Sequence, residues 1–147
     1  MSQLRDPVQH YARARVAANA AAHGLSGSAE YDTEVTASAV FATEAGLSFF
    51  HTHAEGLGLI VFFVTTIAAS VLPWRRARGA VYTLMSLGGL FPLGYLVYSL
   101  AALERGRDAG VEFAERWVLT PLGSAALLGL AVAAGALAVR CWRERAA

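Results

Sequence analysis

Three long apolar blocks dominate the pattern of hydrophobic and polar positions along this chain. They cover residues 57–74, 80–103 and 118–139, and none of them contains a charged residue. A helix needs about 20 predominantly apolar residues to cross the hydrocarbon core of a bilayer. Each block approaches or exceeds this length, so the pattern predicts three transmembrane helices.

The polar N-terminal part of the chain carries the signals of two further helices. Asp6 and the proline after it fit a helix start, and Gly24 is a residue favoured just after a helix end. Ser28 can cap a second helix, which we expect to run without interruption into the first apolar block. Gly46 and Gly56 are positions at which this long helix could bend. We therefore expect a helical hairpin ahead of the first span.

The distribution of arginine predicts which ends of the spans face the cytoplasm. The connection between the first two blocks holds three arginines and no acid, and the C-terminal tail holds three arginines and one acid. The connection before the third block holds three arginines and four acids. Since basic connections stay preferentially in the cytoplasm, we expect the C-terminus inside and the N-terminus outside. The three tryptophans lie at predicted span ends, where such rings fit the headgroup layer.

The predicted fold class is therefore an all-α integral membrane protein. It has three transmembrane helices preceded by an N-terminal extracytoplasmic helical hairpin, whose second helix runs into the first span. We divide it into an extracytoplasmic helical segment, residues 1–50, and a three-helix transmembrane domain, residues 51–147. All twelve basic residues are arginine, which we interpret as a genome composition bias. We expect the protein in the bacterial inner (cytoplasmic) membrane.

Composition excludes several classes of function. The net charge of +1 gives no indication of nucleic-acid binding, and the mean hydropathy of +0.45 fits a membrane protein. A single cysteine, Cys141, forms no internal disulfide and no CxxCH haem-attachment motif. Residues 1–23 carry scattered charges and lack the apolar core of a signal peptide. The sequence contains no hydrolase, protease or nucleotide-binding motif, so we do not expect an enzyme.

Polar residues share one face of the helix predicted through residues 30–66. The group consists of Glu44, Ser48, His51 and Glu55. At about 100° per residue these side chains fall within a stripe roughly 60° wide. His51 and Glu55 are four positions apart and lie one above the other, which is a workable spacing for two ligands of one metal ion. The stripe is the sequence feature that most favours a site.

His53 behaves differently from His51. On a continuous helix it points about 200° away, so the two imidazoles could share an ion only if the chain were extended here. Neutral imidazole suits copper, iron and zinc, and it also ligates b-type haem. Tyr95 and Tyr98 on the second block lie near the same membrane face, where they could hydrogen-bond a ligand or pass an electron. The metal candidates are His51, Glu55, Glu44 and His53. The cofactor-binding candidates are His51, His53, Tyr95 and Tyr98.

A simpler interpretation stands beside this one. Histidines at a membrane interface are commonly amphipathic side chains with a wet polar tip, and Glu44 and Glu55 could be solvated acids. His10 and His23 have no ligand-like neighbours, so we expect both at the surface. On this interpretation the chain binds no cofactor. The sequence supports this alternative as well as it supports a bound transition metal (copper, iron or zinc) or a b-type haem.

Small residues mark packing faces on the second and third spans. Ala125, Gly129 and Ala133 recur at four-residue spacing, which permits close helix packing in lipid. Through such faces we expect contacts with other membrane subunits or a second copy of the chain, besides lipid.

Two functions follow from the sequence. The first is a metal or haem site at the extracytoplasmic face, serving electron transfer or metal handling in a larger complex. The second is a cofactor-free structural or accessory subunit of an energy-transducing membrane complex.

Overall fold

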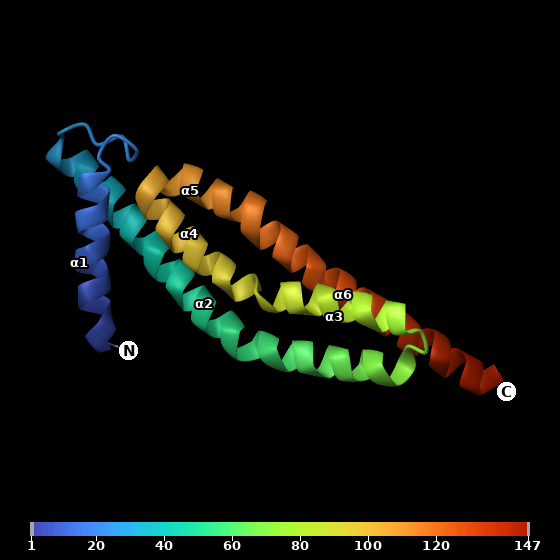
Figure 1. Ribbon diagram of the computed structural model, residues 1–147. Coiled ribbons are helices and arrows are strands. Elements are labelled where there is room, and N and C mark those ends of the chain that lie inside the picture. The colour runs from blue at the N-terminus through green and yellow to red at the C-terminus, as the bar shows by residue number, and fades with distance from the viewer. Residues whose placement is uncertain (1, 147) are drawn as a thin grey trace. The chain divides into compact units, whose positions relative to one another are not determined.

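The computed structural model describes the backbone of residues 2–146 and the side-chain surroundings of residues 6–146. Every regular element within residues 2–146 is a helix (Figure 1), so the all-α prediction is confirmed. In chain order the helices are α1 (Ser2–Ala18), α2 (Ala29–Val71), α3 (Arg75–Gly89), α4 (Phe91–Arg105), α5 (Arg107–Ala114), the π-helical turn η1 (Glu115–Leu119) and α6 (Thr120–Ala146).

Within residues 2–146, three helical runs are long and apolar enough to cross a membrane, which is the number predicted from the apolar blocks. The first run is α2 alone, and the second joins α3 to α4 over Arg75–Arg105. The third joins α5, η1 and α6 over Arg107–Ala146. Runs of this length and composition are consistent with a membrane protein.

The first run is one uninterrupted helix, as predicted. α2 has 43 residues, which corresponds to about 65 Å at a rise of roughly 1.5 Å per residue. It begins directly after Ser28. The carboxylate of Asp32, in its first turn, accepts hydrogen bonds from the backbone N–H groups of Ser26 at 2.8 Å and Gly27 at 2.9 Å. These bonds tie the preceding turn to the helix start.

The predicted bounds of the N-terminal helix are wrong at both ends. α1 begins at Ser2 rather than at Asp6, and Pro7 lies inside it. A proline so near the start removes only one hydrogen bond from the helix. At the other end α1 stops at Ala18, and turns carry the chain from Asn19 to Gly24, where φ is +64°. The side-chain amide of Asn19 donates to the carbonyl oxygen of Leu103, a contact that sequence periodicity could not reveal.

The second and third runs each contain one irregularity. α3 and α4 meet at a break in the second run (Figure 1), where only Leu90 separates them and Pro92 follows two residues later. Proline fits the first turn of a new helix, and because it has no N–H it interrupts the backbone hydrogen bonds that would continue α3 into α4. The third run starts at Arg107 and passes through η1 before α6, so it is longer than the apolar block that predicted it.

By its contacts the chain divides into two compact units. The first unit comprises Met1–His51 and Leu93–Leu119, and the second comprises Thr52–Pro92 and Thr120–Ala147. The first unit has a core in which α1 packs against α2 and the end of α4. The core residues are Ala12, Val16, Ala39, Val40 and Leu103, with Leu25 packed against them. Burial of this apolar surface stabilises the N-terminal helix on its neighbours.

α4 and α5 also pack closely within the first unit. Gly106, with φ at +85°, makes the reversal between them. A Cβ added at Gly110 would lie 2.2 Å from the carbonyl oxygen of Ala101, so the two backbones touch at this point. The guanidinium of Arg105 lies 3.9 Å from the centre of the Phe113 ring, which adds a cation–π contact across the same reversal.

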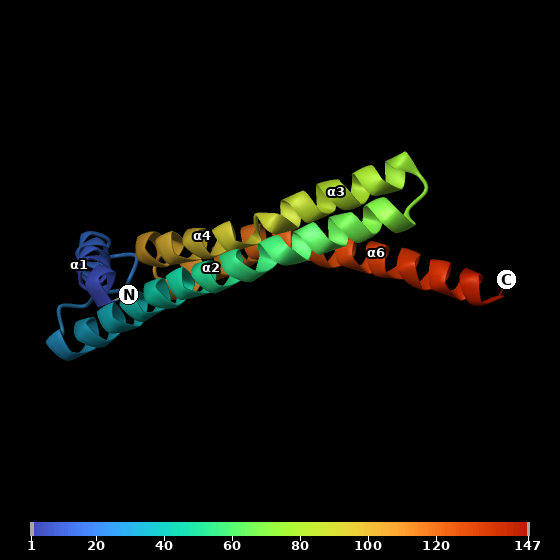
Figure 2. The same ribbon diagram turned by 90° about the horizontal axis from the view of Figure 1, so that it is seen from below.

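The second unit is built on contact between α3 and α6, and α3 returns beside the C-terminal end of α2 (Figure 2). The small residues predicted as a packing face form this contact: Ala125, Gly129 and Ala133 are the buried residues of α6. A Cβ at Gly129 would lie 2.7 Å from the sulfur of Met85, a fully buried side chain. The residues of this core are Val64, Ala68, Leu72, Val81, Met85 and Ala133. The predicted seam therefore packs within the chain.

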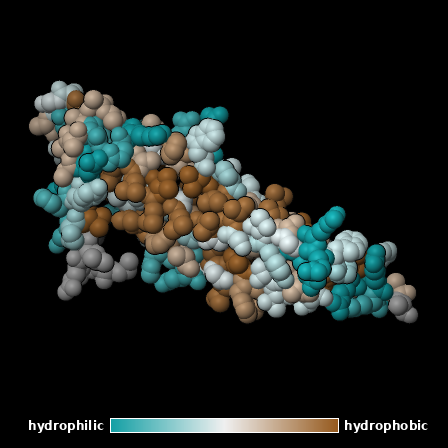
Figure 3. Space-filling view, viewed as in Figure 1, coloured by the Kyte–Doolittle hydropathy of each residue, from teal (hydrophilic) through white to brown (hydrophobic). Residues whose placement is uncertain are grey.

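The outer surfaces of the helical runs remain strongly apolar. Figure 3 shows hydrophobic side chains over much of the visible surface and hydrophilic ones near the C-terminal end of α6. The buried share of the most apolar 18-residue window is 11% in α2, 28% in the second run and 17% in the third. Most of the apolar surface of each run thus faces outward, as expected for contact with lipid or with other helices.

Candidate functional site

The predicted polar stripe lies along the middle of α2. Ser48, His51 and Glu55 are exposed, whereas Glu44 is half-buried. The Glu44 carboxylate accepts a hydrogen bond of 2.7 Å from the side-chain amide of Gln9 on α1. Glu44 therefore takes part in the packing of α1 against α2, a role that was not among those predicted for it.

His51 and His53 have different surroundings on this continuous helix. His51 is exposed, and His53 is half-buried. The His53 ring lies 5.6 Å from the Phe91 ring in an edge-on arrangement. Phe91 also lies against α6, because a Cβ added at Gly123 would come within 3.2 Å of its ring. His53 thus belongs to an aromatic contact inside the second unit.

Tyr95 and Tyr98 both lie against α2, within the first unit. The Tyr95 ring is 5.4 Å from the Phe49 ring. A Cβ added at Gly46 would lie 2.9 Å from a ring carbon of Tyr98 and 3.0 Å from the carbonyl oxygen of Tyr95. The close approach at Gly46 therefore places both tyrosines beside the part of α2 that lies two to five residues before His51. Gly46, one of the two glycines at which the sequence would allow α2 to bend, provides room for α4 at this point.

No group of three or more His, Cys, Asp and Glu side chains among the described residues could hold a metal ion. The pair that the helix brings together on one face is His51 and Glu55. An imidazole and a carboxylate at this spacing can supply two ligands to one metal. A site built on them needs further ligands from outside this helix.

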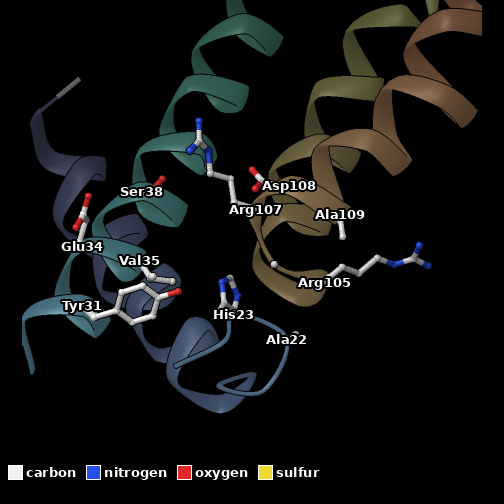
Figure 4. Close-up of a pocket in the computed structure, with 11 residues that line it drawn as sticks. Ala22, His23, Tyr31, Glu34, Val35, Ser38, Arg105, Arg107, Asp108 and Ala109 are labelled. Carbon is white, nitrogen blue, oxygen red and sulfur yellow. The ribbon is translucent and has the colours of Figure 1, made fainter. Parts of the chain in front are cut away.

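A polar cavity of about 500 Å³ lies elsewhere in the first unit, at the α4–α5 reversal (Figure 4). His23 and Tyr31 line one side of it, and Arg107 and Asp108 line the other. Nothing in the sequence predicts that these residues come together, since they belong to a turn, α2 and α5. The cavity unites groups that can donate and accept hydrogen bonds, and it stands apart from the predicted stripe.

The expectation that His23 lies at the surface is wrong, whereas His10 is exposed as predicted. His23 is 8% exposed, and its Nε2 lies 3.0 Å from the carbonyl oxygen of Leu103. The side-chain amide of Asn19 donates to the same oxygen at 3.1 Å. Both bonds satisfy a carbonyl near the end of α4, where the helix leaves its last carbonyls without partners. The role of His23 is therefore to hold the N-terminal turn on α4.

An ion pair reinforces this attachment. The Nε of Arg15 on α1 donates to Glu104 at 2.8 Å, a second guanidinium nitrogen of Arg15 contacts the same carboxylate, and Asn19 also donates to it at 3.1 Å. The hydrogen bond to Glu104 raises the pKa of Arg15 above its ordinary value. Because both partners are exposed, we assign the pair to orientation rather than to a large gain in stability.

Comparison of this chain with models of known protein families, with curated proteins and with solved structures gives no match.

Proposed function

We propose that this chain is a small multi-pass membrane protein that contributes His51 and Glu55 to a metal or haem site within a larger membrane complex. The site would serve electron transfer or metal handling. The observation that carries the proposal is the continuity of α2, which runs through both residues and leaves both exposed. Four positions apart on one helix, they share a face.

The chemistry of the pair suits a transition metal. Neutral imidazole binds copper, iron and zinc, and a nearby carboxylate provides a second, anionic ligand. Zinc sites in proteins use three or four protein ligands, so we place the remaining ones on a partner subunit or a second copy of the chain. For a b-type haem, the His51 imidazole would ligate the iron and the exposed apolar side chains near it would contact the macrocycle.

The other predicted candidates take supporting places in this proposal. His53 contacts Phe91, and Tyr95 contacts Phe49, so both stabilise the helices around the pair. We place Glu44 and Tyr98 in the same supporting role. The proposal thus distinguishes two ligands from four residues that position them.

The arginine distribution supports an orientation with the N-terminal hairpin and the His51 end of the first span outside the cytoplasm. We place the protein in the bacterial inner membrane on the same argument. A cysteine introduced at Ser28, an exposed residue in the turn before α2, tests this orientation. A membrane-impermeant thiol reagent should label Ser28→Cys from outside intact cells, provided that Cys141 is replaced by serine. Labelling only after the cells are opened would reverse the orientation.

The site itself is tested by purifying the protein from membranes in mild detergent. Copper, iron, zinc and manganese are measured by mass spectrometry, and haem is measured by its Soret absorption. We expect one bound cofactor in the unmodified protein and its loss in His51→Ala and Glu55→Ala. His10→Ala is the matched control, since His10 is an exposed histidine on α1. A cofactor content that is zero, or that survives both site substitutions, rules out the site.

A second candidate function rests on a different observation. The apolar surfaces of the three runs are mostly uncovered by the chain itself, with at most 28% of the most apolar window buried. Such surfaces suit a structural subunit that packs among other membrane proteins. Identification of co-purifying proteins separates the two candidates. A structural subunit should retain its partners when His51 is replaced, and it should carry no cofactor.

A further inference from the structure

A cavity of about 490 Å³ lies in the second unit, beside the C-terminal end of α2. Its apolar lining includes Leu72, Trp74, Gly135 and Val139. Three charged side chains of α6 line it as well, those of Arg140, Arg143 and Glu144. An apolar surface that meets cationic side chains at the end of an apolar helix is chemically matched to an amphipathic anion.

The surroundings of this cavity are strongly cationic. Residues 71–79 and 139–146 together hold six arginines and one acid, Glu144. That acid accepts a hydrogen bond of 2.9 Å from Arg140. Arg143 makes no hydrogen bond or ion pair with another residue in the part of the chain that the structure describes. Its charge is therefore available to a ligand.

Arg140 fixes one wall of the cavity. Its Nη1 donates a hydrogen bond of 2.8 Å to the carbonyl oxygen of Ser70, in the last turn of α2. Such carbonyls have no partner within their own helix. The bond therefore holds α6 beside the end of α2 and gives the cavity a defined shape before any ligand enters.

The start of α3 adds a second electropositive group. Trp74 precedes the helix and makes no side-chain capping bond, and the first turn contains no acid. It contains Arg75, Arg76 and Arg78 instead. Arginines are unfavourable at a helix N-terminus, because the unpaired N–H groups there already carry partial positive charge. A bound anion would compensate for this arrangement.

We propose that this cavity binds an anionic phospholipid. Its headgroup phosphodiester accepts hydrogen bonds from Arg143 and lies near the start of α3. An acyl chain follows the apolar wall along Leu72 and Val139. Clusters of arginine directly outside a transmembrane helix attract anionic lipid, with roughly 1 kcal/mol per basic residue. The exposed ring of Trp74 suits the headgroup level at which this lipid would lie.

Lipid retention measured by native mass spectrometry tests this inference. The full chain is reconstituted in nanodiscs of phosphatidylcholine with a minor share of phosphatidylglycerol, released into detergent, and its retained lipids are quantified. We expect phosphatidylglycerol to be retained in preference to phosphatidylcholine. Arg143→Gln should lower this preference about fivefold, the factor that corresponds to roughly 1 kcal/mol.

Arg13→Gln is the matched control, because it removes the same charge from an exposed residue of α1 in the other unit. It should leave the preference unchanged, and an equal loss in both variants would reduce the effect to overall charge and overturn the site. Gly135→Leu should also abolish retention by filling the cavity, since nothing lies within 4 Å of a Cβ at this position and the helix should fold normally. Equal retention of the two lipids by the unmodified protein, or displacement of the lipid by inorganic phosphate alone, would refute the proposal.

Discussion

The contact between α3 and α6 can be tested at Gly88. A Cβ at this residue would lie 2.6 Å from the Cβ of Ala126 and 2.9 Å from its backbone nitrogen. The neighbour is largely backbone, so it cannot rotate away as a flexible side chain would. Gly79 lies on the same helix, and nothing lies within 4 Å of a Cβ added there. Gly79→Ala is therefore a control that makes the same substitution on the same helix without the clash.

The size of the effect follows from these distances. Carbon atoms in favourable contact lie roughly 3.5–4.0 Å apart, so α3 and α6 would have to separate locally by about 1 Å. Overpacking of this kind costs about 1–3 kcal/mol. Both substitutions also gain up to about 1 kcal/mol from the higher helix propensity of alanine. The difference between the two variants cancels that gain, and we expect Gly88→Ala to be less stable than Gly79→Ala by about 1–3 kcal/mol.

The free energy of unfolding is measured in mixed micelles with increasing sodium dodecyl sulfate, using the fluorescence of the three tryptophans. The two variants should unfold in the stated order, with the original protein between them. Equal stability of Gly88→Ala and Gly79→Ala would refute the packing of α3 on α6 at this point. A loss in both variants would instead show that alanine is harmful throughout α3.

Two further predictions concern the first unit. Gly46→Ala should destabilise the protein by about 1–3 kcal/mol, because the added Cβ would lie 2.3 Å from the Ser99 hydroxyl. The control Gly56→Ala, with open space around its Cβ, should be neutral or stabilising in the same micelle assay. Equal changes in stability would contradict the close approach of α4 at Gly46. His23→Ala should lower the free energy of unfolding by about 1 kcal/mol, at the lower end for a lost buried hydrogen bond, since Asn19 still donates to the Leu103 carbonyl. The control His10→Ala, at an exposed histidine, should change it by less than about 0.5 kcal/mol. An equally small change in His23→Ala would contradict the role assigned to His23.

Much of the fold could be predicted because its signals are local. An uncharged apolar block shows a span by its own length and composition, and Pro92 lacks the N–H that would continue the backbone hydrogen bonds from α3 into α4. The small residues Gly129 and Ala133 predicted a packing face correctly, because close approach of two helices requires small side chains on at least one of them. The helix that packs on this face was harder to predict. In the structure it is α3, whereas the sequence equally allowed another protein to pack there.

The residues that prediction missed depend on contacts distant in sequence. His23 and Asn19 both bond to Leu103, 80 and 84 residues away. Nothing in the neighbouring sequence distinguishes His23 from the exposed His10. For the same reason the helical count could group His51 with Glu55 on one face, but it could not show that Gln9 binds Glu44. The ligand role of the pair remains a prediction.

The attachment of the N-terminal turn to the end of α4 has a consequence for the order in which the chain folds. Arg15 leaves the ribosome 89 residues before Glu104, its ion-pair partner. Until then Val16 and Leu25 lack the cover of Leu103, which belongs to the same core. Pairing over such a separation forms late, because the chain must close a long loop first. The N-terminal helix is therefore synthesised first but gains its contacts with α4 only after the second apolar run has been synthesised. A chain that ends after the first run should leave the N-terminal helix without these contacts.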